Sequence, residues 1–442
     1  MDYFATKARK DLSADGLYRI LRSRFAKIPD QRSVHKDIPL DDALMAAFAL
    51  FSLKDPSLLA FDRRREDPND NFRSIYGIKQ VPCDTQMRTI LDPVDPAAVR
   101  PLFRDVFRCL QRGKALERFT YLGGNYLISL DGTGYFSSCK IHCDSCLEKH
   151  HRNGSITYSH QLLGAALVHP DLKEVIPLAP EPIIQQDGHT KNDCERNASR
   201  RWLQQFRREY PRLPVIIVED ALSSNAPHLA DLRAANVHYI IGVKPGDHAF
   251  LFRHLHDAAE AGRAQILTWI DPATNILHHF RFNNGVPLNA AHADELVNVL
   301  EYWELHPSGK VQHFSWITDF ILTEENVFDI MRGGRARWKI ENETFNTLKN
   351  QGYHLEHNYG HGEQNLSVVL VMLMLLAFMV DQTQQLCCPQ FQAALRKMGG
   401  KCYLWEKLRQ LFDDFVFRSM THLLSTVAQG IERLPPPLKN SS

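Results

Sequence analysis

The residues best suited to chemistry lie in the stretch 335–349, in the last third of the chain. Two carboxylates, Glu341 and Glu343, stand there among several cations, and apolar residues recur at a spacing that predicts a helix with one buried face. A metal-binding carboxylate beside phosphate-binding cations would explain this mixture, because a phosphodiester brings negative charge that both must meet. An exposed helix with i,i+4 ion pairs, such as Arg337 with Glu341, is the alternative explanation.

Two further carboxylates follow strand-like runs. Residues 125–130 lead to Asp131, and the Val/Ile run 215–218 leads to Glu219 and Asp220. Continuous apolar runs of this kind are typical of strands buried on both faces, whose carboxyl ends form the edge where open α/β sheets bind ligands. Either aspartate could instead form a turn or cap a helix. Mg²⁺ prefers oxygen ligands and retains several waters, so two such acids and one helix carboxylate would suffice to bind it.

The order Asp131, Asp220, Glu341 resembles the DDE catalytic set of bacterial insertion-sequence transposases. That resemblance implies a ribonuclease H-like catalytic core. It covers about residues 80 to 385.

The helix stretch is similar to the tyrosine–arginine–glutamate–lysine signature of the branch with a β-rich insertion before the last acid. Arg337 and Glu341 have the spacing of that signature, and Lys349 follows them. Gly334 stands where the signature has tyrosine, and Lys349 lies one residue further from the glutamate than is usual. The extra residue leaves Glu343 as an alternative third acid.

Helix geometry distinguishes the two glutamates. Glu341 lies one turn beyond Arg337 and shares its face, whereas Glu343 points about 200° away, on the side of Lys339. We therefore expect Glu341 to be the third catalytic acid.

The resemblance implies metal-dependent phosphodiester chemistry on DNA. The three acids would hold two Mg²⁺ (or Mn²⁺) ions about 3.5–4 Å apart. Cleavage at the transposon ends would be followed by strand transfer into target DNA. The implied partners are double-stranded DNA, as terminal inverted repeats and target, and a second copy of the chain in a homodimer. The residues expected to bind DNA are Arg335, Arg337, Lys339, Lys349, His354 and His357.

Two other classes of protein fit the same residues. A nuclease could keep the two-metal site without strand transfer. A catalytically silent DNA-binding protein would not need the acids, so their joint presence counts against it.

A cluster of cysteine and histidine residues after the first predicted strand suggests a second metal. Cys143 and Cys146 form a Cys-x2-Cys pair, with Cys139 and His150 nearby, and Cys194 could complete the site from a distance. Such donors suit tetrahedral Zn²⁺, which would stiffen the chain rather than catalyse, because a closed site has no open coordination position. A polar loop with reduced thiols is the alternative.

Composition sets the broad class. The chain has 442 residues, 44% of them hydrophobic and 23% charged, with a formal net charge of +1, as expected of a globular protein with several domains. Nine cysteines, unevenly spaced, and an N-terminus without an apolar signal region favour a cytoplasmic protein, bound to the nucleoid when on DNA. The apolar run 368–380 is too short to span a bilayer and predicts a buried core helix, so no membrane is expected.

The pattern along the chain predicts an α/β protein with a ribonuclease H-like mixed sheet, flanking helices and helical terminal regions. The first region is expected to bind DNA through a helix-turn-helix-like arrangement, with Arg63 to Arg65, Arg73 and Arg88 near phosphates, or else to be a packing domain with a basic face. The expected divisions are a helical N-terminal region (1–120), the first part of the core (121–245), a β-rich insertion (246–320), the second part of the core (321–386) and a helical tail (387–442).

Overall fold

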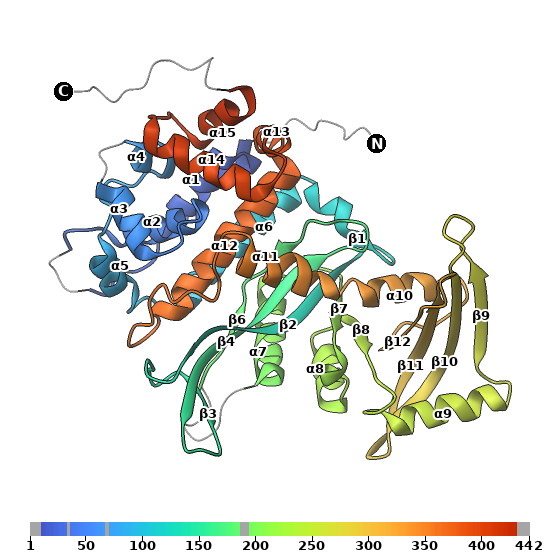
Figure 1. The fold of residues 1–442 in the computed structure, drawn as a ribbon. Coiled ribbons are helices and arrows are strands. Elements are labelled where there is room, and N and C mark those ends of the chain that lie inside the picture. Colours follow the sequence, from blue (N-terminus) through green and yellow to red (C-terminus); the bar gives the residue numbers. More distant parts are fainter. Residues whose placement is uncertain (1–9, 33–35, 67–69, 186–193, 431–442) are drawn as a thin grey trace, which may run out of the picture.

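The computed structural model describes residues 10–32, 36–66, 70–185 and 194–430. They form a mixed α/β fold, with a helical body at one end, a mixed sheet with flanking helices in the middle and a β-rich extension at the other end (Figure 1). The expected fold class is confirmed at this level.

The helical body is built from both ends of the chain (Figure 1). Its N-terminal helices are α1 (Ala14–Phe25), α2 (Leu40–Ser52), α3 (Leu58–Glu66), α4 (Asn71–Tyr76), α5 (Asp84–Leu91) and α6 (Arg100–Arg112). Its C-terminal helices are α12 (Leu366–Cys387), α13 (Pro389–Met398), α14 (Lys401–Asp414) and α15 (Met420–Gln429). The side-chain amide of Asn71 donates to the carbonyl oxygens of Phe412 and Phe415 at 2.7 and 2.6 Å, so residues far apart in sequence share one core.

Helix α12 is the central helix of this body. It is long and apolar enough to cross a membrane, with a mean hydropathy of 2.1, yet its apolar window is 100% buried inside the protein. Lys54 Nζ reaches it from the end of α2 and pairs with Asp381 Oδ2 at 2.5 Å, out of contact with solvent. The apolar run 368–380 is therefore a core helix, as predicted.

The middle of the molecule carries the mixed sheet. Six strand segments, paired antiparallel with one another, come first, and then helix, strand, helix and strand. The strands are β1 (Thr120–Tyr121), β2 (Asn125–Ser138), β3 (Leu147–His150), β4 (Ile156–Val168), β5 (Ile176–Pro177), β6 (Glu181–Ile183), β7 (Val215–Glu219) and β8 (His238–Gly242), and the two helices are α7 (Glu195–Glu209) and α8 (Ala226–Ala234). β2 lies between antiparallel β4 and parallel β7, and β8 continues the sheet parallel to β7. The central strands are fully buried because helices cover them.

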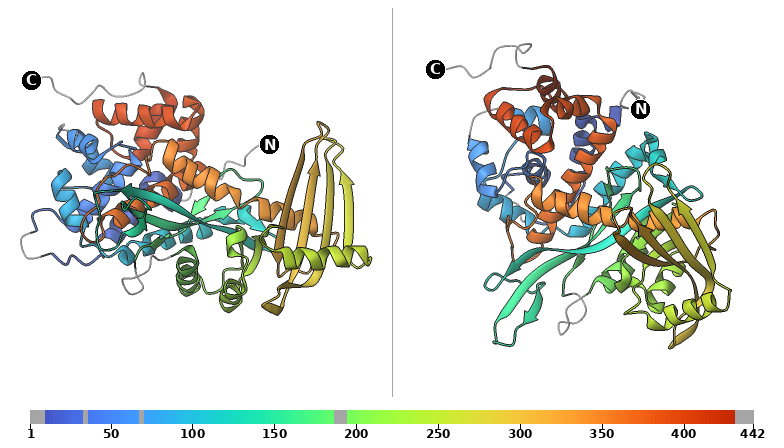
Figure 2. Two further views of the ribbon diagram at one scale, coloured as in Figure 1. Left: turned by 60° about the horizontal axis from the view of Figure 1, so that its bottom comes forward. Right: turned by 45° about the vertical axis from the view of Figure 1, so that its right-hand side comes forward.

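The β-rich insertion continues the same sheet. Its strands are β9 (Gln265–Ile270), β10 (Leu277–Asn289), β11 (His292–Leu305) and β12 (Val311–Thr318). β12 pairs antiparallel with β8, so the insertion extends the core sheet directly. It also contains a helix that the sequence analysis missed, α9 (Ala249–Glu260), which lies across these strands (Figure 2). The buried residues Leu251, Leu255 and Ala258 have the helical spacing that marks it.

The stretch with the candidate third acid is a broken helix that returns from the insertion to the core. It consists of α10 (Val327–Arg335), the π-helical turn η5 (Ile340–Phe345) and α11 (Asn346–Asn350). Residues 351–365 then connect it to α12.

Candidate active site

Asp131 and Asp220 lie on neighbouring parallel strands. Asp220 comes directly after β7, as expected, but the expected strand end at Asp131 is wrong, because β2 continues to Ser138 in its pairing with β4. β2 pairs with β7 through Ser129 and Val218, and each aspartate follows its paired residue by two positions. Because side chains alternate along a strand, the aspartates lie level with each other and on the same side of the sheet. Ser129 shows which side this is, because its hydroxyl donates to the carbonyl oxygen of Arg337 at 3.1 Å. Both aspartates therefore face the broken helix.

Arg337 joins the first and third acids. Its Nη1 lies 3.3 Å from Asp131 Oδ2 and 2.8 Å from Glu341 Oε1. The i,i+4 ion pair between Arg337 and Glu341 is therefore present, but Arg337 also contacts Asp131 on β2. The Arg337 side chain is only 12% exposed, which excludes a simple solvated helix surface.

Asp131 sits in an environment that disfavours its charge. Burial, together with the carboxylates of Glu341 and Glu195, raises its pKa to about 7, although Arg337 opposes this effect. A carboxyl group perturbed by burial and by neighbouring acids is typical of a functional site. A bound cation would relieve the repulsion among these groups.

Glu195 is a fourth carboxylate that the sequence analysis did not assign to the site. It begins α7, and burial and the charges of Asp220 and Glu219 raise its pKa. Its side chain fills the space in front of Gly132, where any Cβ would collide with it. An acid in the first turn of a helix is already explained by its favourable interaction with the helix dipole, so there was no reason from the sequence to place Glu195 near the aspartates. The glycine directly after Asp131 was the available signal.

An open pocket of about 330 Å³ lies beside the middle of β2 and the carboxyl end of β7. Asp131, Asp220 and Glu195 all line it, and Glu341 reaches Asp131 from the helix side. Asp220 Oδ1 also accepts from the backbone N–H of Leu222 at 2.9 Å, so the capping role holds as well. A carboxylate accepts several bonds, and capping does not prevent it from binding a ligand.

The π-helical turn accounts for the extra residue between Glu341 and Lys349. Residues 340–345 form a π-helix, which holds one residue more per turn than an α-helix and recurs at functional sites. Regular 100° steps therefore do not apply across this turn. Glu341 nevertheless faces Asp131 through Arg337, while the charge of Glu343 acts on Lys339, as the helix argument expected.

The missing signature tyrosine has a steric reason. Gly334 packs against the indole of Trp316 on β12, and a Cβ at this position would collide with that ring. Trp316 is buried, with an exposed fraction of 5%. A tyrosine at position 334 would require the insertion to move away from the helix.

Comparison with known proteins finds a matching family model. Residues 172–379 match the model of the family described as transposase DDE domain. This segment, just under half of the chain, carries a transposase DDE domain. The match includes Asp220 and Glu341, whereas Asp131 precedes it. The expectation of a DNA transposase, an enzyme that cleaves DNA, is confirmed.

Among solved structures, the transposase is similar to a piggyBac transposase in a synaptic complex with hairpin DNA. The identity is 11%, the likeness covers 96% of this chain and 82% of the other, and the TM-score is 0.40. No curated protein matches the chain.

The transposase uses several of the predicted DNA-binding cations in contacts within the protein. Arg335 pairs with Glu304 of β11, and Lys339 Nζ donates to the carbonyl oxygen of Leu172 at 2.7 Å. Lys349 Nζ lies 2.8 Å from Glu356 Oε1 in a pair whose glutamate is 65% exposed. Such exposed pairs contribute little to stability, so this pair does not commit Lys349 to a structural role. His354 and His357 are exposed on the segment that follows.

Some of the N-terminal arginines are likewise used in contacts within the protein, whereas others are exposed. Arg64 holds two carboxylates, Asp55 and Asp413, and its side chain is largely buried. Arg63 and Arg73 are exposed. Arg64 is therefore not part of the basic surface expected in this region, whereas Arg63 and Arg73 are exposed.

The cysteine and histidine cluster forms, with a different composition from the predicted one. Cys143 and Cys146 come together, but Cys139 and His150 are exposed on the outer part of the β2–β4 hairpin, and Cys194 lines the pocket of the aspartates. His150 Nε2 instead lies 3.1 Å from Glu148 Oε2. The two remaining members of the cluster are His160 of β4 and His361 of the segment before α12. Sequence spacing could not predict them, because they are brought in by strand pairing and by the return of the chain from the broken helix.

Proposed function

We propose that this chain is the transposase of a bacterial insertion sequence, which cuts DNA at the ends of its element and joins those ends to target DNA. One observation carries the proposal. The register of β2 and β7 sets Asp131 level with Asp220, and Arg337 holds Glu341 against Asp131. Acids from two strands and one helix thus converge, although they lie far apart in sequence.

The pocket suits divalent cations. Its donors are carboxylates, it is open, and burial with like charge destabilises the ionised form of Asp131. Asp131, Asp220 and Glu341 would hold Mg²⁺ or Mn²⁺, with Glu195 as a further oxygen donor beside them. Bound there, such ions activate a hydroxyl nucleophile and stabilise the charge that develops on the phosphate.

The protein positions the acids through its own contacts. Ser129 fixes the backbone at Arg337, and Arg337 orients two carboxylates and supplies a cation near the scissile phosphate. Lys349 and the exposed His354 and His357 lie just beyond the broken helix and would bind the flanking phosphates.

The proposed partners are the double-stranded terminal repeats and target DNA. A homodimer would pair the two ends, and the reaction would take place in the cytoplasm, at the nucleoid. Measurement of the mass of the protein–DNA complex tests the dimer, since two chains and two ends are expected.

The reaction is tested by supplying the protein with Mg²⁺, pre-cut element ends and a target plasmid. Joined products are expected. Cleavage without joining would identify a nuclease, and a mobility shift with neither would identify a DNA-binding protein. Both results would contradict the proposal, and Asp131→Asn serves as the inactive control.

A further inference from the structure

Two cysteines and two histidines converge at the outer end of the β2–β4 hairpin, away from the carboxylates. Cys143 Sγ lies 3.9 Å from Cys146 Sγ and 3.5 Å from His160 Nε2. Cys146 Sγ lies 3.3 Å from His160 Nε2 and 3.5 Å from His361 Nε2. All four donor atoms fall within 4.8 Å of one another.

These separations are those of a tetrahedral metal site. With Zn–S near 2.3 Å and Zn–N near 2.05 Å, a tetrahedron places two sulfurs about 3.8 Å apart and a sulfur and a nitrogen about 3.6 Å apart. The observed sulfur–sulfur and sulfur–nitrogen distances agree with these values to within about 0.3 Å.

The surroundings of the cluster are unsuited to four neutral polar groups. Cys146, His160 and His361 are buried, with exposed fractions of 1%, 1% and 8%. The ring of Phe136 lies 4.3 Å from that of His361. Within the described part of the chain, the Nδ1 atoms of His160 and His361 have no hydrogen-bond partner, so their Nε2 atoms make the polar contacts of these rings. Thiols are weak donors and acceptors, and they compensate poorly for burying two imidazoles.

The cluster joins segments that are otherwise far apart in the chain. Cys143 and Cys146 lie in the turn between β2 and β3, and His160 lies on β4, where it pairs with Phe136 of β2. His361 belongs to the segment that leaves the broken helix. A bond to His361 would therefore fasten that segment to the core sheet.

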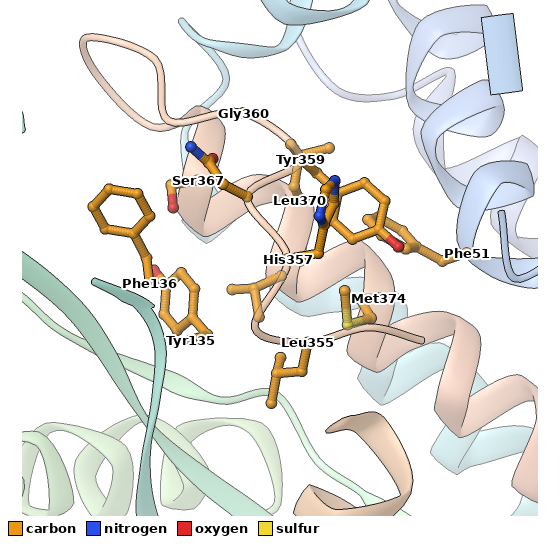
Figure 3. Close-up of a pocket in the computed structure, with 12 residues that line it drawn as sticks. Phe51, Tyr135, Phe136, Leu355, His357, Tyr359, Gly360, Ser367, Leu370 and Met374 are labelled. Atoms are coloured by element: carbon orange, nitrogen blue, oxygen red, sulfur yellow. The ribbon is translucent and has the colours of Figure 1, made fainter. Parts of the chain in front are cut away.

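The other end of the same segment is held by the helical body. The Asp92 carboxylate accepts from the backbone N–H groups of four successive residues, 363 to 366, at 3.0 to 3.1 Å, and so caps α12. In Figure 3, the segment runs between Tyr135 and Phe136 of β2 on one side and Leu370 and Met374 of α12 on the other. A metal at His361 would complete the fixation of this connection.

We propose that Cys143, Cys146, His160 and His361 bind one structural Zn²⁺ that fastens the segment after the broken helix to the β2–β4 hairpin. Binding converts both thiols to thiolates and releases two protons to solvent, while the two imidazoles coordinate as neutral ligands through Nε2. Four protein ligands close the coordination sphere, so this metal supports the fold and leaves chemistry to the carboxylates.

Metal analysis of the purified full-length protein, kept reduced and dialysed against a weak chelator, tests the proposal. About one Zn²⁺ per chain is expected for the wild type, and less than about a tenth of that in a folded sample would overturn it. Cys143→Ser, His160→Ala and His361→Ala should lose the metal. The matched controls Cys139→Ser and His150→Ala alter exposed residues of the same hairpin and should keep it, and loss of zinc in these controls would contradict the ligand set.

Three further measurements complement the metal analysis, and two of them use the wild type, so they hold even if a ligand variant folds poorly. Exchange of the wild-type metal for Co²⁺ should give the visible absorption of a tetrahedral ion with thiolate charge transfer, and an octahedral spectrum would refute the site. His361→Cys should still bind one metal, because a Cys₃His set also suits zinc. A strong chelator should lower the melting temperature of the wild type and both controls. None of these readouts depends on DNA cleavage, so this proposal can fail or succeed separately from the transposase reaction.

Discussion

The ring of Phe345 lies against Gly164, the residue of β4 that pairs with Asp131 on β2. A Cβ at position 164 would come within 2.7 Å of the ring atom Cε1. Phe345, the last residue of the π-helical turn, thus packs beside the strand position that pairs with Asp131. The contact is so close that only glycine fits at position 164. The distance between the helix and the sheet, and with it the reach of Glu341 toward Asp131, depends on this contact.

Gly164→Ala should therefore weaken cleavage more than it weakens the fold. The added methyl group pushes the helix from the sheet, which should cost about 1–3 kcal/mol of stability and lower the cleavage rate at least about tenfold. Gly134→Ala on β2 is the matched control, because nothing lies within 4 Å of the point that a Cβ would occupy there, and it should behave as wild type. Recovery of cleavage in Gly164→Ala with Phe345→Leu would support the steric cause, and full activity of Gly164→Ala alone would refute it.

Asp131→Asn and Asp220→Asn should each abolish Mg²⁺-dependent cleavage while leaving the fold and DNA binding in place. Each change removes an anionic ligand from the pocket and about 10²-fold or more of rate, without emptying a core position. Cleavage of labelled terminal DNA and a mobility shift measure the two properties. Asp294→Asn, on β11 in the insertion, is the control. Wild-type cleavage rates in Asp131→Asn or Asp220→Asn would contradict the assignment of that aspartate to the active site.

Glutamine at positions 341 and 343 should separate the two candidate third acids. Glu341→Gln should eliminate cleavage, because this carboxylate shares Arg337 with Asp131. Glu343→Gln should keep most of the activity, since its charge acts on Lys339 instead. The same DNA cleavage assay serves for both, and the opposite outcome would assign the site to Glu343.

The metal-free stability of the protein should depend on the charge of Asp131. Burial raises its pKa from 3.8 to about 7, so the folded state holds this proton more tightly than the unfolded state. The resulting stability is present at low pH and is lost as pH rises through about 7. Asp131→Asn removes the effect, so without divalent ions it should melt above wild type at about pH 8, and the gap should narrow steadily toward about pH 5. Thermal melting across this range checks the sign, and added Mg²⁺ should stabilise the wild type alone.

Two adjacent arginines should have opposite effects on DNA binding and stability. Arg63 is exposed, so Arg63→Ala should weaken binding uniformly across sequences and reduce the salt slope by about one. Arg64 holds Asp55 and Asp413, so Arg64→Ala should lower stability by about 3 kcal/mol by leaving a buried carboxylate unpaired. DNA affinity measured over a range of salt, together with unfolding curves, distinguishes them. An unchanged salt slope for Arg63→Ala would remove this surface from the DNA contacts.

The sequence was sufficient to predict the two neighbouring strands, because a continuous apolar run is a strong local signal of a buried strand. The run 215–218 forms β7, and the apolar residues before Asp131 form the first part of β2, which continues beyond that aspartate to Ser138. The parallel pairing that aligns the two aspartates follows from the helix between the strands.

The rest of the site depended on contacts between distant residues. The π-helical turn is held by the packing of Phe345 against Gly164. These two residues are far apart in sequence, so local spacing does not predict the contact. Glu195 enters the site only because α7 starts beside Gly132, in the middle of β2. His361 lies 215 residues from Cys146, so its place in the Cys/His cluster was invisible to spacing rules.

The pairing of β12 with β8 makes the insertion a continuation of the core sheet rather than a tethered module. Its strands extend the core sheet outward through hydrogen-bonded ladders (Figure 2). Gly334 packs against Trp316 of β12, the strand that pairs with the core. Hydrogen-bonded strand pairing does not allow the insertion to rotate relative to the core, as a flexible linker would. Any DNA bound to the far strands would therefore be held at a fixed distance from the carboxylates, and the number of strands in the insertion would set that distance. Changes in its hairpin turns would leave that separation unaltered.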